Sequence, residues 1–269
     1  MGYWQDRWQR SQQKLTQKSL KQVEKQLARY YGSAMRHAIA DFEATYDKLL
    51  ATMEEGREPT PADLYKLDKY WQMQGQLRQE LQKLGEKQIA ALSNIFETNF
   101  FEVYYSLGIP GEQAYNTISR EGALQLINSI WAADGKSFSQ RVWGNVERLV
   151  ETLNEGLLDC VITGKKTSEL KKTLQERFGV SYRRADMLAR TELAHVQTEA
   201  AKRRYEDYGI QKVQFWADPD ERTCPECGKM HAKIFLATEA IPLPLHPNCR
   251  CTLLPVIEEK KEKTLDETL

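Results

Sequence analysis

The sequence predicts a mainly α-helical protein, with an elongated N-terminal helical region followed by a small α+β C-terminal domain. Six of the nine prolines and four of the five cysteines lie between residues 219 and 255. In the preceding residues, apolar side chains recur at steps of three and four, which is the period of an amphipathic helix. Because proline interrupts helices, the long first part can form them and the short last part cannot.

The first hundred residues predict a long antiparallel helical hairpin. The apolar stripe of its first helix is Leu20, Val23, Leu27, Tyr30, Ala34, Ala38, Phe42, Tyr46 and Leu49. The stripe of its second helix is Leu64, Leu67, Trp71, Gln74, Leu77, Leu81, Leu84, Gln88, Leu92 and Ile95. Each series lies on one helical face, and Glu58-Pro59-Thr60-Pro61 separates the two helices. About 40 residues at about 1.5 Å each span roughly 60 Å, which is the length of an arm rather than of a compact core.

Shorter elements are expected after Gly108-Ile109-Pro110-Gly111, which ends the hairpin. Two or three short helices would fill residues 112–158, with Trp131 and Trp143 in their core. A helix beginning near Thr167 would stop at Gly179, and Ser181 would cap a further helix. The helices at residues 112–158 belong to the N-terminal region. The helices that begin near Thr167 and Ser181 belong to the C-terminal domain.

A strand is predicted at residues 212–217, where side chains alternate and β-forming residues are frequent. The expected division is a helical docking region at 1–160, a C-terminal domain at 165–257 and a disordered charged tail at 258–269. Thirty-eight basic and thirty-eight acidic residues give a formal net charge of zero. This balance excludes a strongly basic nucleic-acid coat or an acidic mimic as a description of the whole chain.

The sequence shows neither a membrane span nor a secretory signal. No window holds eighteen consecutive apolar residues, and no apolar stretch follows the start of the chain. A cytoplasm is therefore the expected place of synthesis, and its reducing conditions favour thiols or metal ligands over disulfides.

Two closely spaced groups of soft ligands predict a zinc site. Cys224-Pro225-Glu226-Cys227 is followed, after eighteen residues, by His246-Pro247-Asn248-Cys249-Arg250-Cys251. Two such half-sites are what tetrahedral zinc requires. The expected ligands are Cys224 and Cys227 with two of His246, Cys249 and Cys251, the last two sharing a face if they lie on a strand. A closed four-ligand site leaves no position for water, so this Zn²⁺ would stabilise the α+β domain rather than catalyse.

Other interpretations of these residues stay open. The cysteines could be reduced and unmetallated, or the CxxC could be a redox pair, although it lacks the βαβ surroundings of such pairs. Cys160 stands alone on a predicted helix and is expected to be a small buried hydrophobe. His37 and His195 have no partner at metal-ligand spacing, which favours packing or surface positions.

Several motifs taken together resemble one known family. They are Ala189-Arg190-Thr191-Glu192-Leu193-Ala194, Trp216-Ala217-Asp218, the CxxC, Lys233-Ile234-Phe235 and the segment from Pro244 to Thr252. This combination is similar to the phage Mu F-like head morphogenesis family, also called minor capsid or minor head proteins, over about residues 167–257. Met230-His231-Ala232 stands where the family often has a turn glycine, which makes His231 either a spare ligand or a surface residue.

The resemblance implies a structural component of tailed-phage heads, not an enzyme. It implies a location in the virion head interior after assembly in the bacterial host cytoplasm. It also implies association with the portal protein, contact with scaffold or major capsid protein, and a part in head assembly and DNA passage. Fewer than twenty residues follow Thr252, so no toxin domain of the kind fused to some members is expected. The alternative is a zinc-dependent nuclease or nucleic-acid-binding effector that uses the same cysteine and histidine cluster.

The N-terminal forty residues are locally basic, with eight basic residues against Asp6 and Glu24. Four of the basic residues recur at helical spacing and line one face: Lys14, Lys18, Lys21 and Lys25. This face predicts non-specific contact with DNA phosphates. The other interpretation is a solvated helix face or a contact with an acidic surface of a partner. Trp4 and Trp8, four residues apart, predict an exposed apolar pair that could dock on another protein.

Overall fold

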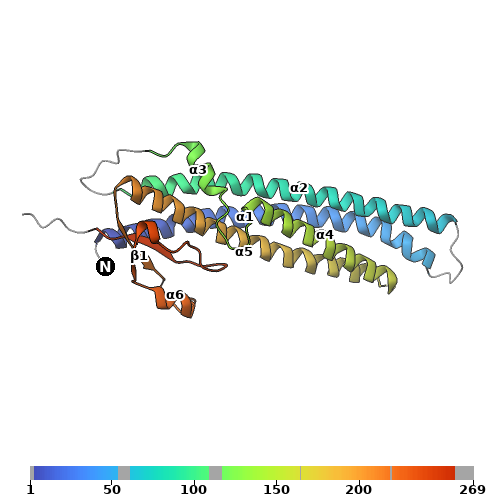
Figure 1. The fold of residues 1–269 in the computed structure, drawn as a ribbon. Helices are drawn as coiled ribbons and strands as arrows, with labels where there is room; N and C mark the ends of the chain where they lie inside the picture. The colour runs from blue at the N-terminus through green and yellow to red at the C-terminus, as the bar shows by residue number, and fades with distance from the viewer. Residues whose placement is uncertain (1–2, 54–60, 109–116, 164, 219, 258–269) are drawn as a thin grey trace, which may run out of the picture.

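The computed structural model describes residues 3–53, 61–108, 117–163, 165–218 and 220–257. Long helices pack side by side in an elongated bundle, and a small sheet lies at the end where the chain begins (Figure 1). The long helices are α1 (Tyr3–Met53), α2 (Pro61–Ser106), α4 (Phe138–Ile162) and α5 (Thr167–Asp207). A short helix, α3 (Arg120–Ile127), lies between α2 and α4 in the sequence. The predicted mainly helical fold with a small C-terminal α+β region is confirmed.

The predicted hairpin is present as α1 and α2, and most of its stripe residues are buried or half-buried. Trp71 is an exception, since 59% of it is exposed. The side chains of Leu49, Leu64 and Leu67 lie outside the described residues. The hairpin is not a separate arm, because α4 and α5 pack along it and share its core (Figure 1).

Helix α5 is continuous where the sequence predicted two helices separated at Gly179 and Ser181. A glycine inside a helix costs only about 1 kcal/mol relative to alanine. Burial of Phe178 and Ala185 on either side outweighs that cost. Ser181 is buried, and its hydroxyl lies 3.4 Å from the Tyr31 hydroxyl of α1 instead of capping a helix.

Gly85 lets α2 and α4 approach closely, because a Cβ at that position would lie 2.6 Å from the Trp143 ring. Trp143 is half-buried and packs against the core, as the sequence predicted. We expect Gly85→Ala to lower the free energy of unfolding by about 1–3 kcal/mol, since the ring must shift in a packed interface. Thermal denaturation followed by circular dichroism measures the effect.

Gly75→Ala is the matched control on the same helix. Nothing lies within 4 Å of a Cβ at Gly75. Alanine should stabilise this exposed helical position by about 0.5–1 kcal/mol. Equal effects of the two substitutions would show that the Trp143 contact does not restrict position 85.

The C-terminal sheet has three antiparallel strands in the order β2-β1-β3. These are β1 (Lys212–Trp216), β2 (Ile234–Leu236) and β3 (Thr252–Pro255), with α6 (Pro225–Met230) and a 3-10 turn, η1 (Ala237–Glu239), in the connections. Val213 of the central strand lies opposite Phe235 on one side and Pro255 on the other. The strand predicted at 212–217 is confirmed as β1.

The sheet packs against the beginning of α1 and the end of α5. The Tyr205 hydroxyl donates to the Leu253 carbonyl at 3.0 Å, and the Thr252 hydroxyl donates to Gln12 Oε1 at 2.9 Å. Trp8 is only 2% exposed, and its ring centroid lies 6.4 Å from that of Tyr205. The predicted exposed tryptophan pair is therefore wrong for Trp8, which is buried beside α5. The side chain of Trp4 lies outside the described residues.

Helices on both sides of the predicted boundary near residue 160 pack into one bundle. The division into a docking region and a C-terminal domain stays a prediction. The tail at 258–269 lies outside the described residues. Within the residues that are described, no helix is both long and apolar enough to cross a bilayer.

Candidate metal centre

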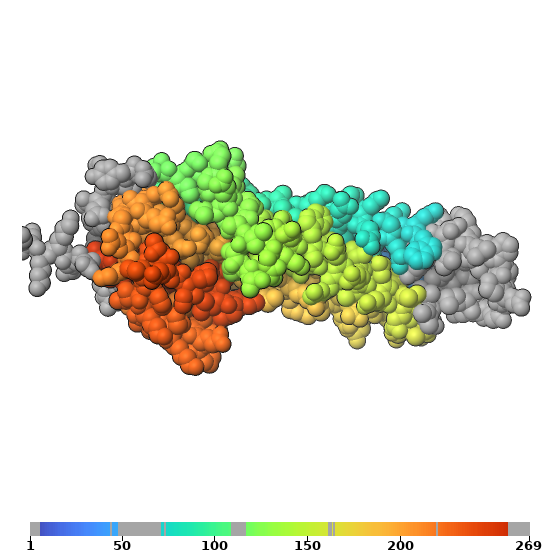
Figure 2. All heavy atoms as spheres, in the orientation of Figure 1, coloured from blue at the N-terminus to red at the C-terminus, as the bar shows by residue number. Residues whose placement is uncertain are grey.

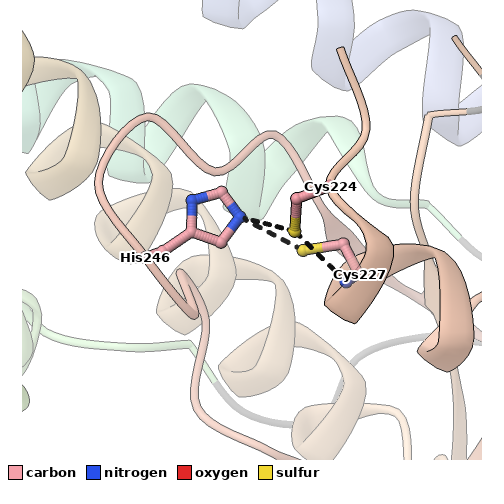
Figure 3. Close-up of side chains that lie close together, drawn as sticks. All are labelled: Cys224, Cys227 and His246. Carbon is pink, nitrogen blue, oxygen red and sulfur yellow. Dashed lines mark hydrogen bonds between the residues drawn. The ribbon is translucent and has the colours of Figure 1, made fainter. Parts of the chain in front are cut away.

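Cys224, Cys227 and His246 point their ligand atoms at one another (Figure 3). Cys224 is the N-cap of α6, and its sulfur accepts the Cys227 backbone N–H at 3.3 Å. This first turn of α6 brings both sulfurs to the same place, where His246 arrives from the loop before β3. The Nε2 atom of His246 lies 3.3 Å from each of the two sulfurs.

Cys227, Cys249 and Cys251 form a second group, whose sulfurs all lie within 4.8 Å of one another. Cys227 belongs to both groups, and its sulfur lies 3.9 Å from that of Cys249. Cys249 and Cys251 precede β3 rather than lying on a strand, so the strand argument for their shared face is wrong. The Cys249 N–H donates to the His246 carbonyl at 3.1 Å in a tight turn, with Asn248 at a φ of 60°, and this turn brings Cys249 back beside His246.

The orientation of His246 is that of a metal ligand. Its Nδ1 lies 2.9 Å from the Pro247 carbonyl, which fixes the ring and leaves Nε2 directed at the sulfurs. Metal-binding histidines commonly use the second ring nitrogen in this way. That carbonyl raises the pKa of His246.

The spacing and chemistry of the donors fit zinc. Zn–S bonds of about 2.3 Å and Zn–N bonds of about 2.0–2.1 Å place tetrahedral donors about 3.6–3.8 Å apart. The distances of 3.3 and 3.9 Å between donor atoms are close to this value. Thiolates and a neutral imidazole are also the ligands that zinc prefers. The sequence prediction that these residues come together is consistent with this geometry.

The thiols of the cluster strongly influence one another. A hydrogen bond from Cys251 lowers the pKa of Cys249 to about 5. Burial raises the pKa of Cys227 to about 12, and hydrogen bonding to Cys249 raises that of Cys251. Several thiolates therefore resist forming together, and a divalent cation would relieve their repulsion.

His231 belongs to neither group. Its Nδ1 accepts the Ala217 N–H at 3.3 Å, and its ring packs against Trp216 with centroids 4.4 Å apart. Cys160 is fully buried in α4, as predicted. His37 lies at the surface, where its Nδ1 is 3.6 Å from Glu80.

An ion pair of Arg250 fixes the loop that carries Cys249 and Cys251. Arg250, between Cys249 and Cys251, donates to Asp220 at 2.7 Å and lies 3.6 Å from Asp218. Hydrogen bonding from Arg250 lowers the pKa of Asp220 well below its usual range. The ion pair joins the loop before β3 to the segment that leads into α6, so it holds the two half-sites together.

The Arg190-Thr191-Glu192 motif on α5 connects the bundle to the cysteine loop. Arg190 pairs with Asp186 at 2.7 Å and with Glu24 of α1. The Thr191 hydroxyl accepts the Asn248 N–H at 3.1 Å. The motif therefore fixes the loop of the second half-site against α5.

Glu192 lies in a buried network that sequence reasoning did not find. Its side chain is 3% exposed, accepts a hydrogen bond from Trp131 Nε1 at 3.0 Å and forms an ion pair with Arg141. Arg141 also pairs with Asp134 at 2.7 Å and thereby lowers the pKa of Asp134 to about 2. Burial raises the pKa of Glu192, against the influence of Trp131 and Arg141. Trp131 itself is half-buried, and its ring stacks on His195 with centroids 4.5 Å apart.

His195 should make stability fall in mild acid. Burial lowers its pKa to about 4, whereas the unfolded chain takes up that proton near pH 6.5. Because the unfolded state binds more protons between these values, the free energy of unfolding should fall as the pH drops from about 6.5 to about 4. The loss should reach at most about 3 kcal/mol. Urea denaturation over this pH range measures it.

His195→Phe is the control, because it keeps an aromatic ring against Trp131 but carries no titratable group. Other groups lose stability equally in both proteins, so the difference between them isolates His195. Parallel decreases in the wild type and the variant would contradict a buried neutral histidine.

The four lysines of the predicted DNA-binding face are all exposed on α1. Lys18 forms an ion pair with Glu102 of α2, so part of its charge is neutralised. The other three, Lys14, Lys21 and Lys25, remain on the solvent-facing side of the bundle. Their contact with DNA stays a prediction.

Comparisons with known proteins match part of the chain to a family. The model of the family described as phage Mu protein F like protein matches residues 151–254, which include the end of α4, α5 and the whole cysteine cluster. The NAD(+)--arginine ADP-ribosyltransferase EFV of Enterococcus faecalis (strain ATCC 700802 / V583) is 21% identical over 277 residues. That alignment covers 94% of this chain and 55% of the transferase, so the chain spans about half the length of this curated relative. No solved structure matches. Over residues 151–254, this chain is similar to the phage Mu protein F like family.

Proposed function

We propose that this protein is a structural component of a phage head that acts in head morphogenesis and binds the portal protein. The observation that supports the proposal is the family match over residues 151–254, the same region in which the cysteine cluster and the Arg190-Thr191-Glu192 motif are joined. Its working place would be the virion head interior, after assembly in the host cytoplasm. Scaffold and major capsid proteins are further candidate partners.

Co-purification with the portal protein of the same phage tests the proposal. A stable complex of the two full-length proteins is the expected result. Deletion of residues 212–257 and, separately, of the tip of the α1–α2 hairpin would then locate the contact. Two folded partners that do not associate would contradict portal binding.

Within this protein, we propose that zinc has a structural part. Cys224, Cys227, His246 and Cys249 would hold the ion, and Cys251 would remain a neighbouring thiol. Cys224, Cys227 and His246 form one mutually close group, and Cys249 is the more buried of the two remaining cysteines. The ion would cross-link α6 to the loop before β3 and supply no reactive group.

Single substitutions test whether Cys249 or Cys251 is the fourth zinc ligand. Cys249→Ser should lose zinc, whereas Cys251→Ser should keep one zinc per chain, measured by mass spectrometry of the metal content. Retention by Cys249→Ser and loss by Cys251→Ser would assign Cys251 as the fourth ligand instead.

Non-specific DNA contact through α1 is a further part of the proposal. Replacing Lys14, Lys21 and Lys25 with glutamate should weaken binding to duplex DNA. It should also reduce the slope of log affinity against log salt by about 1 for each lost phosphate contact. The matched control replaces the exposed Lys87, Lys172 and Lys229, which lie on α2, α5 and α6 instead of α1. Equal losses in both triple variants would contradict a role for the α1 lysines.

The rival function is a metal-dependent nuclease. The two groups of possible ligands found among the described residues contain thiols and one imidazole but no carboxylate. Nuclease sites use oxygen-rich ligands and an open position for water, which this donor set does not favour. DNA or RNA cleavage that depends on metal and disappears in His246→Ala would establish the rival. The likeness to a transferase makes ADP-ribosylation of arginine a second activity to assay in the same preparation.

A further inference from the structure

A groove of about 640 Å³ lies between α4, α5 and the proline-containing loop at residues 241–247. Arg141 and Arg148 line it from one face of α4, and Arg184, Met187 and Thr191 line it from one face of α5. Its volume lies within the range of about 300–1,000 Å³ that is typical of ligand sites. Figure 2 shows this side of the molecule, where the orange and red C-terminal residues lie beside the green segment that leads into α4.

The groove has an uncompensated positive charge at one end. Asp134 and Glu192 are the carboxylates among its described lining residues, and both are paired with Arg141. Arg148 and Arg184 also line the groove, but no carboxylate of its lining is left to pair with them.

The two remaining arginines should lie at the same level of the helix pair. Helices α4 and α5 are consecutive and antiparallel, and Arg141 contacts Glu192 across them (Figure 1). Arg148 follows Arg141 by seven residues and Arg184 precedes Glu192 by eight, which places both about 10–12 Å from the buried pair. Two like charges facing one groove favour an anion between them.

The rest of the groove suits aliphatic side chains rather than nucleobases. Met187 is 38% exposed and Leu245 is 36% exposed, and prolines of the loop complete this wall. The Trp131 ring is already engaged, because His195 stacks on it and the Arg141 guanidinium lies over it, 5.3 Å from its ring centroid. Single-stranded nucleic acids usually need an open aromatic surface for stacking.

We propose that this groove binds a short extended segment of an acidic partner protein. Carboxylates of the segment would lie between Arg148 and Arg184, where guanidinium groups can bind them in a bidentate manner. Aliphatic side chains next to those carboxylates would contact Met187 and Leu245. The identification of the partner as another virion protein rests on the proposed function, whereas the peptide chemistry rests on the groove alone.

Fluorescence anisotropy with the full-length protein tests the groove. The probe is a short fluorescein-labelled peptide of alternating glutamate and leucine. The comparison probes are the same peptide with lysine in place of glutamate, and labelled oligothymidylate. The acidic peptide should bind saturably and more weakly as salt is raised, and at least about tenfold more tightly than either comparison probe.

Variants then locate the binding. Arg148→Gln combined with Arg184→Gln should weaken acidic-peptide binding at least about tenfold. The matched control is Arg177→Gln combined with Arg183→Gln, two exposed arginines of α5 outside the groove, which should bind as the wild type does. Circular dichroism confirms that each variant is folded.

Three results would overturn the proposal: no saturable binding, equal losses in both double variants, or tighter binding of oligothymidylate. The last result would assign the groove to nucleic acid. Because this measurement uses no second virion protein, it can fail while co-purification with the portal succeeds. The reverse outcome is equally distinguishable.

Discussion

Replacing Cys227 by serine is expected to remove the metal and unfold the C-terminal sheet while the helical bundle stays folded. Cys227 belongs to both groups of possible ligands and is 2% exposed. Structural zinc contributes about 10–16 kcal/mol of binding free energy in small domains. This exceeds the roughly 1–3 kcal/mol that a typical core substitution costs. Metal content by mass spectrometry and limited proteolysis of residues 212–257 measure the two effects.

Cys160→Ser is the matched control, because it makes the same chemical change at a fully buried cysteine outside the cluster. This variant should keep one zinc per chain and a protease-resistant sheet, with some loss of thermal stability. A Cys227→Ser protein that retains both its zinc and its resistance to protease would refute the structural role of the metal.

Among the substitutions proposed for this protein, breaking the Arg141–Glu192 ion pair should cause the second largest loss of stability. Arg141→Met leaves a carboxylate whose side chain is 3% exposed without its cation. Removing one partner of a buried ion pair typically lowers the free energy of unfolding by about 3–5 kcal/mol at neutral pH. Burial already raises the pKa of Glu192, and loss of Arg141 should raise it further. An acid with a raised pKa stabilises the fold at low pH, so the penalty should shrink as the pH falls.

A double-mutant cycle isolates this interaction. Glu192→Gln keeps an acceptor for Trp131 and removes the charge, so adding it to Arg141→Met should restore part of the lost stability. Arg120→Met is the control for an exposed pair, since Arg120 is 67% exposed beside Glu97 and its loss should cost less than about 1 kcal/mol. Additive effects of Arg141→Met and Glu192→Gln would show that the two residues are not coupled.

The first prediction concerns how the C-terminal residues are attached to the bundle, and the second concerns how α4 and α5 are joined within it. The metal cluster joins α6 to the loop before β3, and Thr191 joins that loop to α5. Loss of the cluster should therefore also disturb the groove, since His246 contributes to its lining. Acidic-peptide binding by Cys227→Ser would report on this connection.

The local elements of this protein could be read from its sequence. Apolar residues at steps of three and four predicted α1 and α2, alternation predicted β1, and ligand spacing predicted the convergence of Cys224, Cys227 and His246. Each of these features depends on residues close in the sequence, or on a ligand pattern whose chemistry allows few alternatives.

The long-range contacts were decided by the tertiary structure alone. Burial across the bundle keeps α5 continuous at Gly179, and Trp8 is buried with its ring beside Tyr205 of α5. The Arg141–Glu192 pair joins residues 51 positions apart, and the Thr252–Gln12 hydrogen bond joins residues 240 positions apart. No periodicity records such contacts, because they depend on how the helices pack and on which side chains that packing removes from water.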